Sequence, residues 1–219
     1  MNPPISSQTP AAIREWLEER GDRRFRADQI AQWIHQKHPA DWSGMTNLGI
    51  QLRLGLARHF EFSTVELSRK QGSADTTQKF LWRLRDGQFV ESVLIPASPA
   101  LYGEASDRHT LCVSTQVGCA YGCTFCASGL EGFKRNLEPA EIIDQVLATE
   151  RWRREQSGGG AGERLVNNLV IMGMGEPLAN YDNLLDALEI LNADWGAHIG
   201  ARKITISTSG LVPQIRALA

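Results

Sequence analysis

Long apolar segments are missing from this 219-residue sequence. No stretch approaches the roughly 18 uninterrupted apolar residues that a membrane-spanning helix needs, and the chain opens with Pro, Ser and Gln instead of a basic and then apolar leader. We therefore expect a cytoplasmic chain without a membrane segment. A large positive charge is also missing, because the formal net charge is -2. This excludes binding of nucleic acid by bulk charge alone but not by a local basic patch.

Cysteine is scarce and unevenly placed. The chain has four cysteines, which lie within fifteen consecutive residues at Cys112, Cys119, Cys123 and Cys126. A disulfide framework spreads its cysteines to connect distant loops, so this clustering favours a metal or redox site. The remaining composition, with 42% hydrophobic and 22% charged residues, is sufficient to bury a core and excludes intrinsic disorder.

The chain is predicted to divide into a small helical domain (residues 1–62), a β-hairpin connecting segment (63–105) and an α/β part (106–219). Residues 1–11 are polar and lack an apolar period, so we expect a loose tail. From residue 12, apolar residues recur at spacings of three and four, which predicts about three short helices. We expect the basic residues of this domain to form a solvated face, with an RNA contact as the second interpretation.

A change to period-two alternation marks residues 64–96 as strand. Asp86-Gly87 separates two alternating runs and predicts a hairpin turn. Glu91 lies in the second run among apolar neighbours. By itself this position indicates only a glutamate on the solvent face.

The pattern after residue 109 is strand, loop and helix repeated, which predicts parallel strands with right-handed crossovers. The expected elements are a strand at 110–117, a helix from Pro139 to a glycine linker at 157–162, a strand at 165–172, a helix at 183–191 and a strand at 203–207. Three such strands leave an exposed edge, and the last helix has barely begun at Gln214. We therefore expect an N-terminal fragment of a longer protein or an incomplete reading frame.

Three of the cysteines form the pattern C-x3-C-x2-C on a loop at the carboxyl end of the first of these strands, where α/β folds bind their ligands. Three thiolates on a 4Fe-4S cluster leave the fourth iron open for a ligand. A closed zinc site needs a fourth cysteine or histidine. Cys112 and His109 precede the loop, so a zinc site stays open as the alternative.

The same pattern, with an aromatic residue directly before its last cysteine, is the signature of radical S-adenosylmethionine (SAM) enzymes. Residues 110–119 and 132–137 resemble the RlmN/Cfr family of radical methyltransferases, which act on a ribosomal RNA adenine, and in particular its RlmN branch. Residues 25–30 and 45–48 resemble the helical RNA-binding domain of that family, and residues 86–96 resemble its hairpin. The resemblance implies an α/β fold in which residues 106–219 form the first half of a radical SAM (β/α) barrel.

The resemblance also implies roles for individual residues. Cys119, Cys123 and Cys126 match the ligands of the 4Fe-4S cluster. The residues expected to bind SAM are Gly175, Glu176 and Ser207, which follow the second and third predicted parallel strands. Glu91 matches the proton acceptor proposed for the family, and Cys112 matches the thiol that resolves a methyl-cysteine adduct as a disulfide bond. Without the resemblance, Cys112 is more simply a small buried residue in a strand.

The implied reaction is methylation of carbon 2 of an adenine in 23S rRNA through a methyl-cysteine intermediate. The sequence has no cysteine after Cys126, so the methyl-carrying residue is absent and we expect the chain to be inactive alone. Transfer RNA as a further substrate and carbon 8 as the target stay open, and an electron donor such as flavodoxin is implied. The alternatives are another radical SAM RNA-modifying enzyme and a non-catalytic, zinc-binding RNA-binding module.

Overall fold

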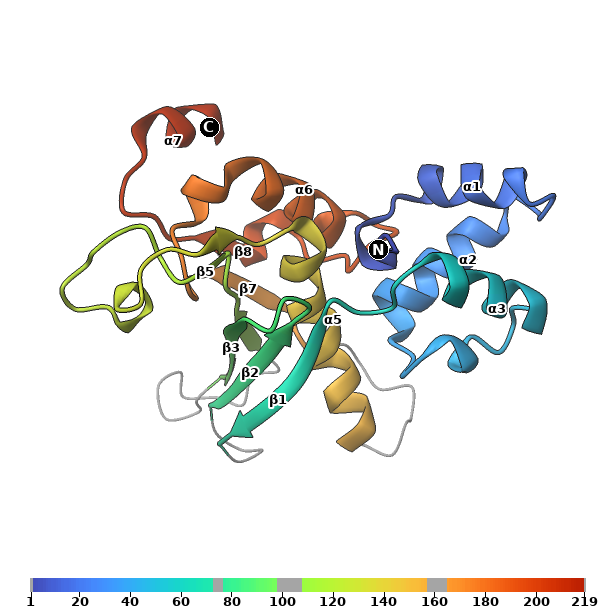
Figure 1. Cartoon of the computed structure of the whole chain (residues 1–219), viewed down its shortest axis with the longest axis horizontal. Helices are drawn as coiled ribbons and strands as arrows, with labels where there is room; N and C mark the ends of the chain where they lie inside the picture. Colours follow the sequence, from blue (N-terminus) through green and yellow to red (C-terminus); the bar gives the residue numbers. More distant parts are fainter. Residues whose placement is uncertain (1, 73–76, 98–107, 157–164, 219) are drawn as a thin grey trace.

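The computed structural model describes residues 2–72, 77–97, 108–156 and 165–218. Helices at the N-terminal end lie at one side of the molecule, and the loop that carries three cysteines projects at the other (Figure 1). A mixed sheet lies between them and is backed by a long helix. The arrangement therefore agrees with the predicted α/β class.

The N-terminal part forms the three expected helices, followed by strands. Their bounds are α1 (Pro10–Glu19), α2 (Arg26–Gln32) and α3 (Ile50–His59). Thr9 caps α1, because its hydroxyl accepts a hydrogen bond from the Ala12 amide. The helix α2 continues into the π-helical turn η2 (Trp33–Lys37), which ends at His38 in the left-handed region. A short 3-10 turn, η3 (Trp42–Gly44), precedes α3.

The predicted loose tail is wrong. Residues 5–7 form the 3-10 turn η1 (Ile5–Ser7), and the Ile5 side chain is 1% exposed. The backbone of this segment pairs with Glu61, whose carbonyl accepts from the Ile5 amide at 3.0 Å and whose amide donates to Pro3 at 3.0 Å. The sequence did not predict this turn for two reasons. A single buried isoleucine gives no apolar periodicity, and its backbone partner lies some 56 residues away in the sequence.

Six strands form one sheet in the order β1-β2-β3-β4-β7-β8. Their bounds are β1 (Val65–Gln71), β2 (Gln78–Leu84), β3 (Phe89–Pro96), β4 (His109–Cys112), β7 (Asn168–Ile171) and β8 (Ile204–Ile206). The first four are antiparallel, and β4, β7 and β8 run parallel. The predicted hairpin at Asp86-Gly87 is confirmed as the connection of β2 and β3.

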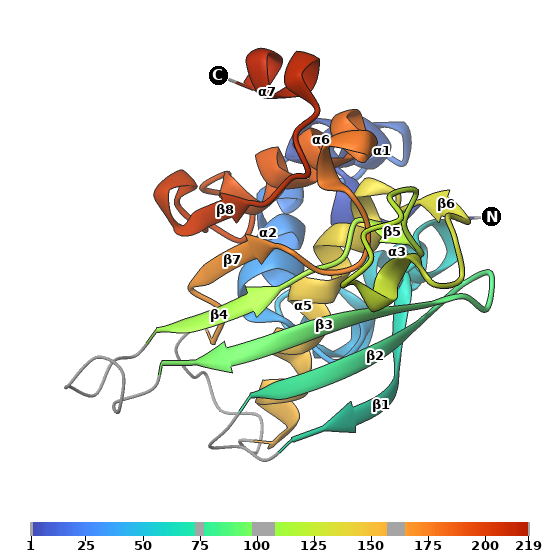
Figure 2. The same cartoon turned by 90° about the vertical axis from the view of Figure 1, so that its left-hand side faces the viewer.

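Two details of the predicted sheet need correction. The β3 strand pairs with β4, with Val93 opposite Cys112, so the hairpin extends the parallel sheet and covers one of its edges (Figure 2). The single strand expected at 110–117 is two strands, because β4 ends at Cys112 and β5 (Gln116–Val117) pairs with β6 (Arg135–Asn136). Strand pairing between distant segments was not readable from periodicity.

Helix α5 (Pro139–Gln156) covers one face of the sheet, and α6 (Tyr181–Asn192) packs against α5 (Figure 2). Along β3, residues 90, 92 and 94 are buried on the α5 side and the alternate residues are more exposed. The opposite face is therefore the open face of the sheet. The remaining elements are η4 (Ala127–Gly129), η5 (Pro177–Asn180), η6 (Ala201–Lys203) and α7 (Val212–Leu218).

One hydrophobic core runs from the helical part into the sheet and its helices. The three-part division of the chain stays a prediction, and its boundary at residues 105/106 lies outside the described residues, as does the expected glycine linker at 157–162. Within the described ranges, no helix has the length and apolar character needed to cross a membrane.

Candidate functional site

The cysteine loop is closed at its base by backbone contacts. Strand β5 precedes it, β6 follows it, and the two pair with Val117 opposite Arg135. Gly118 has a φ of +71°, and a Cβ atom there would lie 1.9 Å from the Gly132 carbonyl oxygen. Only glycine fits this position without displacing the backbone. The loop from Cys119 to Cys126 therefore projects from a fixed base.

The three loop cysteines offer accessible thiols. All four cysteines lie in the described part of the chain and are free, so the structure gives no support to a disulfide bond. The Ser128 hydroxyl and backbone donate to Cys126 and lower the pKa of its thiol, which favours the thiolate that ligates metals. Among the described residues, no three His, Cys, Asp or Glu side chains already converge on one point.

The donor set fits an iron–sulfur cluster better than closed zinc coordination. The fourth thiol, Cys112, lies at the end of β4 and outside the loop, and burial raises its pKa. His109 begins the same strand, three residues and roughly 10 Å further from the loop. Zinc in a structural site needs four ligands together. The loop itself supplies three thiols, which is the number that leaves one iron of a 4Fe-4S cluster open.

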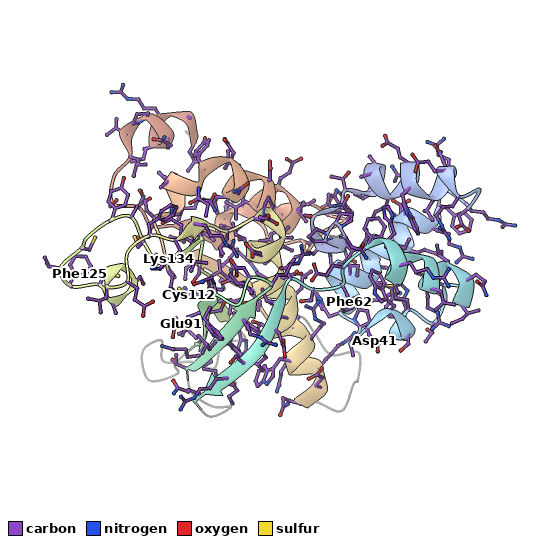
Figure 3. All side chains as sticks on the ribbon, viewed as in Figure 1. Asp41, Phe62, Glu91, Cys112, Phe125 and Lys134 are labelled. Atoms are coloured by element: carbon purple, nitrogen blue, oxygen red, sulfur yellow. The ribbon has the colours of Figure 1, made fainter. Side chains whose placement is uncertain are left out.

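Glu91 and Cys112 lie on the open face of the sheet. Val93 is the partner of Cys112 across β3 and β4, and Glu91 is two residues from Val93, so all three side chains share one face. Figure 3 shows Glu91 and Cys112 on the side of the molecule from which the cysteine loop projects. Both residues therefore lie on one face of the sheet, and their roles in the reaction stay a prediction.

Ser114 joins Glu91 to the loop that follows β7. Its hydroxyl donates to the Glu91 carbonyl at 2.6 Å and accepts from the Met174 amide at 2.8 Å. Gln145 of α5 accepts from the Ser114 amide at 2.9 Å and donates to its carbonyl at 3.0 Å. The sequence analysis missed this connection. Ser114 lies within residues 110–119, but the pattern of that stretch does not show which residues Ser114 contacts.

The glycines of the loop after β7 allow close approach to residues 113–116. A Cβ atom at Gly173 would lie 2.6 Å from the Val113 carbonyl carbon, and one at Gly175 would lie 2.5 Å from the Gln116 side chain. Gly175 also has a φ of +102°. Glycine is needed at both positions because a side chain would clash with residues 113–116. SAM binding by Gly175 stays a prediction.

Glu176 connects the loop after β7 to the loop after β8. Its side chain accepts four hydrogen bonds, and the residue is 4% exposed. The donors are the Leu178 amide (3.0 Å), the Thr208 hydroxyl (2.6 Å), the Ser209 amide (2.7 Å) and the Ser209 hydroxyl (2.8 Å). Burial alone would raise the pKa of Glu176, but these hydrogen bonds outweigh it and lower the pKa.

Thr208 and Ser209 are site residues that the sequence analysis missed, although they directly follow Ser207. Ser207 itself is exposed at the carboxyl end of β8, where its amide donates to the Ile171 carbonyl at 3.3 Å. The only available signal was the run of hydroxyl residues at 207–209. The predicted SAM-binding set therefore lies at two adjacent strand ends, with Glu176 already held by its own neighbours.

A cavity of about 520 Å³ lies between the open face of the sheet and the cysteine loop. Its walls bring together Glu91 of β3, Met174 of the loop after β7, and the segment at the base of the cysteine loop, which includes Gly118 and Lys134 (Figure 3). Cys112, Glu176 and Ser207 are not among its lining residues. Glu91 and the base of the cysteine loop therefore line the same cavity.

Arg135 links the base of the cysteine loop to the β2–β3 turn and to α5. Its guanidinium contacts Asp86 of the hairpin turn at 2.7 Å and forms two bonds to Glu141 of α5, at 2.7 and 2.8 Å. The Glu141 side chain is 5% exposed. A buried carboxylate without its cation is costly, whereas an exposed pair contributes little.

We expect Arg135→Ala to lower the free energy of unfolding by about 2 kcal/mol, because the buried Glu141 carboxylate loses its cation and keeps only the Glu138 amide as a donor among the described residues. Arg83→Ala is the control, since its partner Glu66 is 69% exposed, and we expect no measurable change in the free energy of unfolding. Urea denaturation followed by circular dichroism measures both. An equal loss of unfolding free energy in the two variants would show that Arg135 contributes no more than an exposed ion pair.

Two family models match the chain. The model of the ribosomal RNA large subunit methyltransferase N-terminal domain matches residues 6–62, and that of the radical SAM superfamily matches residues 113–219. Over 217 residues, the chain is 52% identical to a protein of Akkermansia muciniphila named as a probable dual-specificity RNA methyltransferase RlmN. The chain belongs to the RlmN family of radical SAM proteins.

Further relatives agree with this assignment. A dual-specificity RNA methyltransferase RlmN of Anaeromyxobacter dehalogenans is 46% identical over 216 residues. The crystal structure of a radical SAM methyltransferase from Sphaerobacter thermophilus superposes with a TM-score of 0.86 at 40% identity. The match to each covers 99% of this chain but only 56% and 60% of the other protein, respectively, and 58% of the Akkermansia protein. The RlmN family and the radical SAM fold predicted from the sequence are confirmed.

Proposed function

We propose that this chain forms the cluster-binding and SAM-binding part of a radical SAM methyltransferase that modifies carbon 2 of an adenine in 23S rRNA. The observation that supports it most directly is the loop with three free thiols, which projects beside a cavity lined by Glu91. The relatives' names specify RNA methyltransferases. Their wording of dual specificity supports a second RNA substrate, for which we propose transfer RNA.

In this proposal, Cys119, Cys123 and Cys126 hold a 4Fe-4S cluster. SAM binds at the strand ends that carry Glu176 and Ser207, with the Gly175 backbone alongside. The cluster and SAM together supply one-electron chemistry at a carbon that ordinary methyl transfer does not reach. An electron donor such as flavodoxin and a cytoplasmic location belong to the same proposal.

The chain's own residues bind and orient the substrate. An adenine must leave its stack to reach a cavity of this size, which favours single-stranded or remodelled RNA. Glu91 presents a carboxylate on the open face and accepts a proton from the substrate. Burial raises the pKa of the half-buried Cys112 thiol. In this proposal Cys112 is the resolving residue, and it gives up its proton when it attacks as a thiolate.

The test is anaerobic reconstitution of the chain with iron and sulfide, followed by a reductant and SAM. We expect iron and sulfide to bind and 5′-deoxyadenosine to form. We expect no methylated RNA from this chain alone, because it has no cysteine after Cys126 to carry the methyl group. Stoichiometric zinc in place of iron would contradict the proposal and favour a zinc-binding RNA module.

A further inference from the structure

An ion pair crosses β2 and β3 on the open face of the sheet. The Lys79 ammonium lies 2.5 Å from Oε1 of Glu91, and the two side chains are 44% and 36% exposed. Lys79 is opposite Val93 in the strand register and Glu91 is opposite Leu81, so the pair is diagonal. Diagonal partners on one face are within reach of long side chains.

This ion pair has little value for folding. Exposed ion pairs contribute little to stability, because water screens the charges and both side chains lose conformational freedom. Arg83–Glu66 is a similar cross-strand pair at 2.6 Å on the same sheet. The two pairs differ in location. Lys79 and Glu91 both line the 520 Å³ cavity beside the cysteine loop, whereas Arg83 and Glu66 do not.

The chemistry of the Lys79 ammonium indicates which ligand it binds. Four charged residues line the cavity, namely Lys79, Lys134, Glu91 and Glu131. While Lys79 contacts Glu91, its ammonium occupies an oxygen of the carboxylate that the proposed function assigns to proton transfer. An ammonium is a compact charge with three donors and is well suited to phosphate. RNA brings one phosphate with every nucleotide.

We propose that Lys79 binds a backbone phosphate of the RNA, and that Lys79 contacts Glu91 only while no RNA is bound. This inference rests on the proposed function, because it takes RNA as the substrate. When a phosphate binds the ammonium, the Glu91 carboxylate loses a cation and faces the base of the bound nucleotide. The exchange replaces one exposed ion pair by another, so it requires no rearrangement of the sheet.

The test is fluorescence anisotropy of a short, labelled, single-stranded RNA that contains adenosine, at several KCl concentrations. For Lys79→Met we expect about fivefold weaker binding and a salt slope reduced by about 0.7, the value for one phosphate contact on a single strand. For Glu91→Gln we expect binding about threefold tighter, because Lys79 no longer gives up a partner. In the double variant the gain from Glu91→Gln disappears.

Arg83→Met and Glu66→Gln are the matched controls and are expected to change neither affinity nor slope. Unchanged binding in Lys79→Met, or equal losses in Lys79→Met and Arg83→Met, would overturn the phosphate site. Wild-type protein that cleaves SAM but does not bind the RNA would also overturn it, while the radical SAM assignment stands. RNA binding that depends on Lys79 in a protein that takes up no iron would support the phosphate site and contradict the proposed function.

Discussion

Cys123→Ala is expected to abolish iron–sulfur cluster formation and to reduce SAM cleavage by more than about 10³-fold, to background. The loop supplies only three thiols. When one of them is removed, no neighbouring thiol on the loop can take its place as a ligand of that iron. Visible absorbance, iron content and 5′-deoxyadenosine after anaerobic reconstitution measure the effect. Cys119→Ala and Cys126→Ala are expected to behave in the same way.

Cys112→Ala is the matched control, since it removes a thiol that lies on β4, outside the loop. We expect this variant to bind the same amount of iron and to cleave SAM within about twofold of the wild type. The result separates the two metal hypotheses. Loss of metal in Cys112→Ala as in Cys123→Ala would indicate four thiolate ligands, which is the donor set of structural zinc.

The sequence was sufficient for elements whose pattern is local. The hairpin at Asp86-Gly87 follows from turn chemistry between alternating runs, and the helix from Pro139 follows from its apolar spacing. It was not sufficient for pairings between distant segments. The Ile5–Glu61 backbone contact and the β3–β4 pairing both join residues that share no local pattern.

The candidate site shows the same division. The spacing of the cysteines identified the loop, but Ser114 and Ser209 act through hydrogen bonds to residues 23 and 33 positions away, respectively. Lys79 was within reach of sequence reasoning, because the turn at Asp86-Gly87 fixes the hairpin register and sets Lys79 diagonal to Glu91. To predict the Lys79–Glu91 contact, the sequence analysis had to align the two strands residue by residue as well as locate them.

Glu176→Gln is expected to lower the free energy of unfolding by about 3 kcal/mol at neutral pH. Each oxygen of the carboxylate accepts one backbone amide, from Leu178 on Oε1 and from Ser209 on Oε2. A glutamine amide group replaces one of these acceptors by a donor, so one amide loses its partner in a buried site. The exposed Asp186→Asn in the middle of α6 is the control and is expected to change stability by less than about 0.5 kcal/mol.

The pH dependence of this difference identifies its cause. Hydrogen bonds lower the pKa of Glu176 in the folded chain, so its contribution to stability is present above the unfolded pKa of about 4.3 and is lost as the pH falls through the folded value. The gap between wild type and Glu176→Gln is therefore largest near pH 7 and narrows below about pH 4, as the wild-type carboxylate takes up its proton. Urea denaturation at several pH values measures the gap. A gap of constant size across this range would mean that the variant acts through packing, and that the charge of Glu176 does not hold the two strand-end loops together.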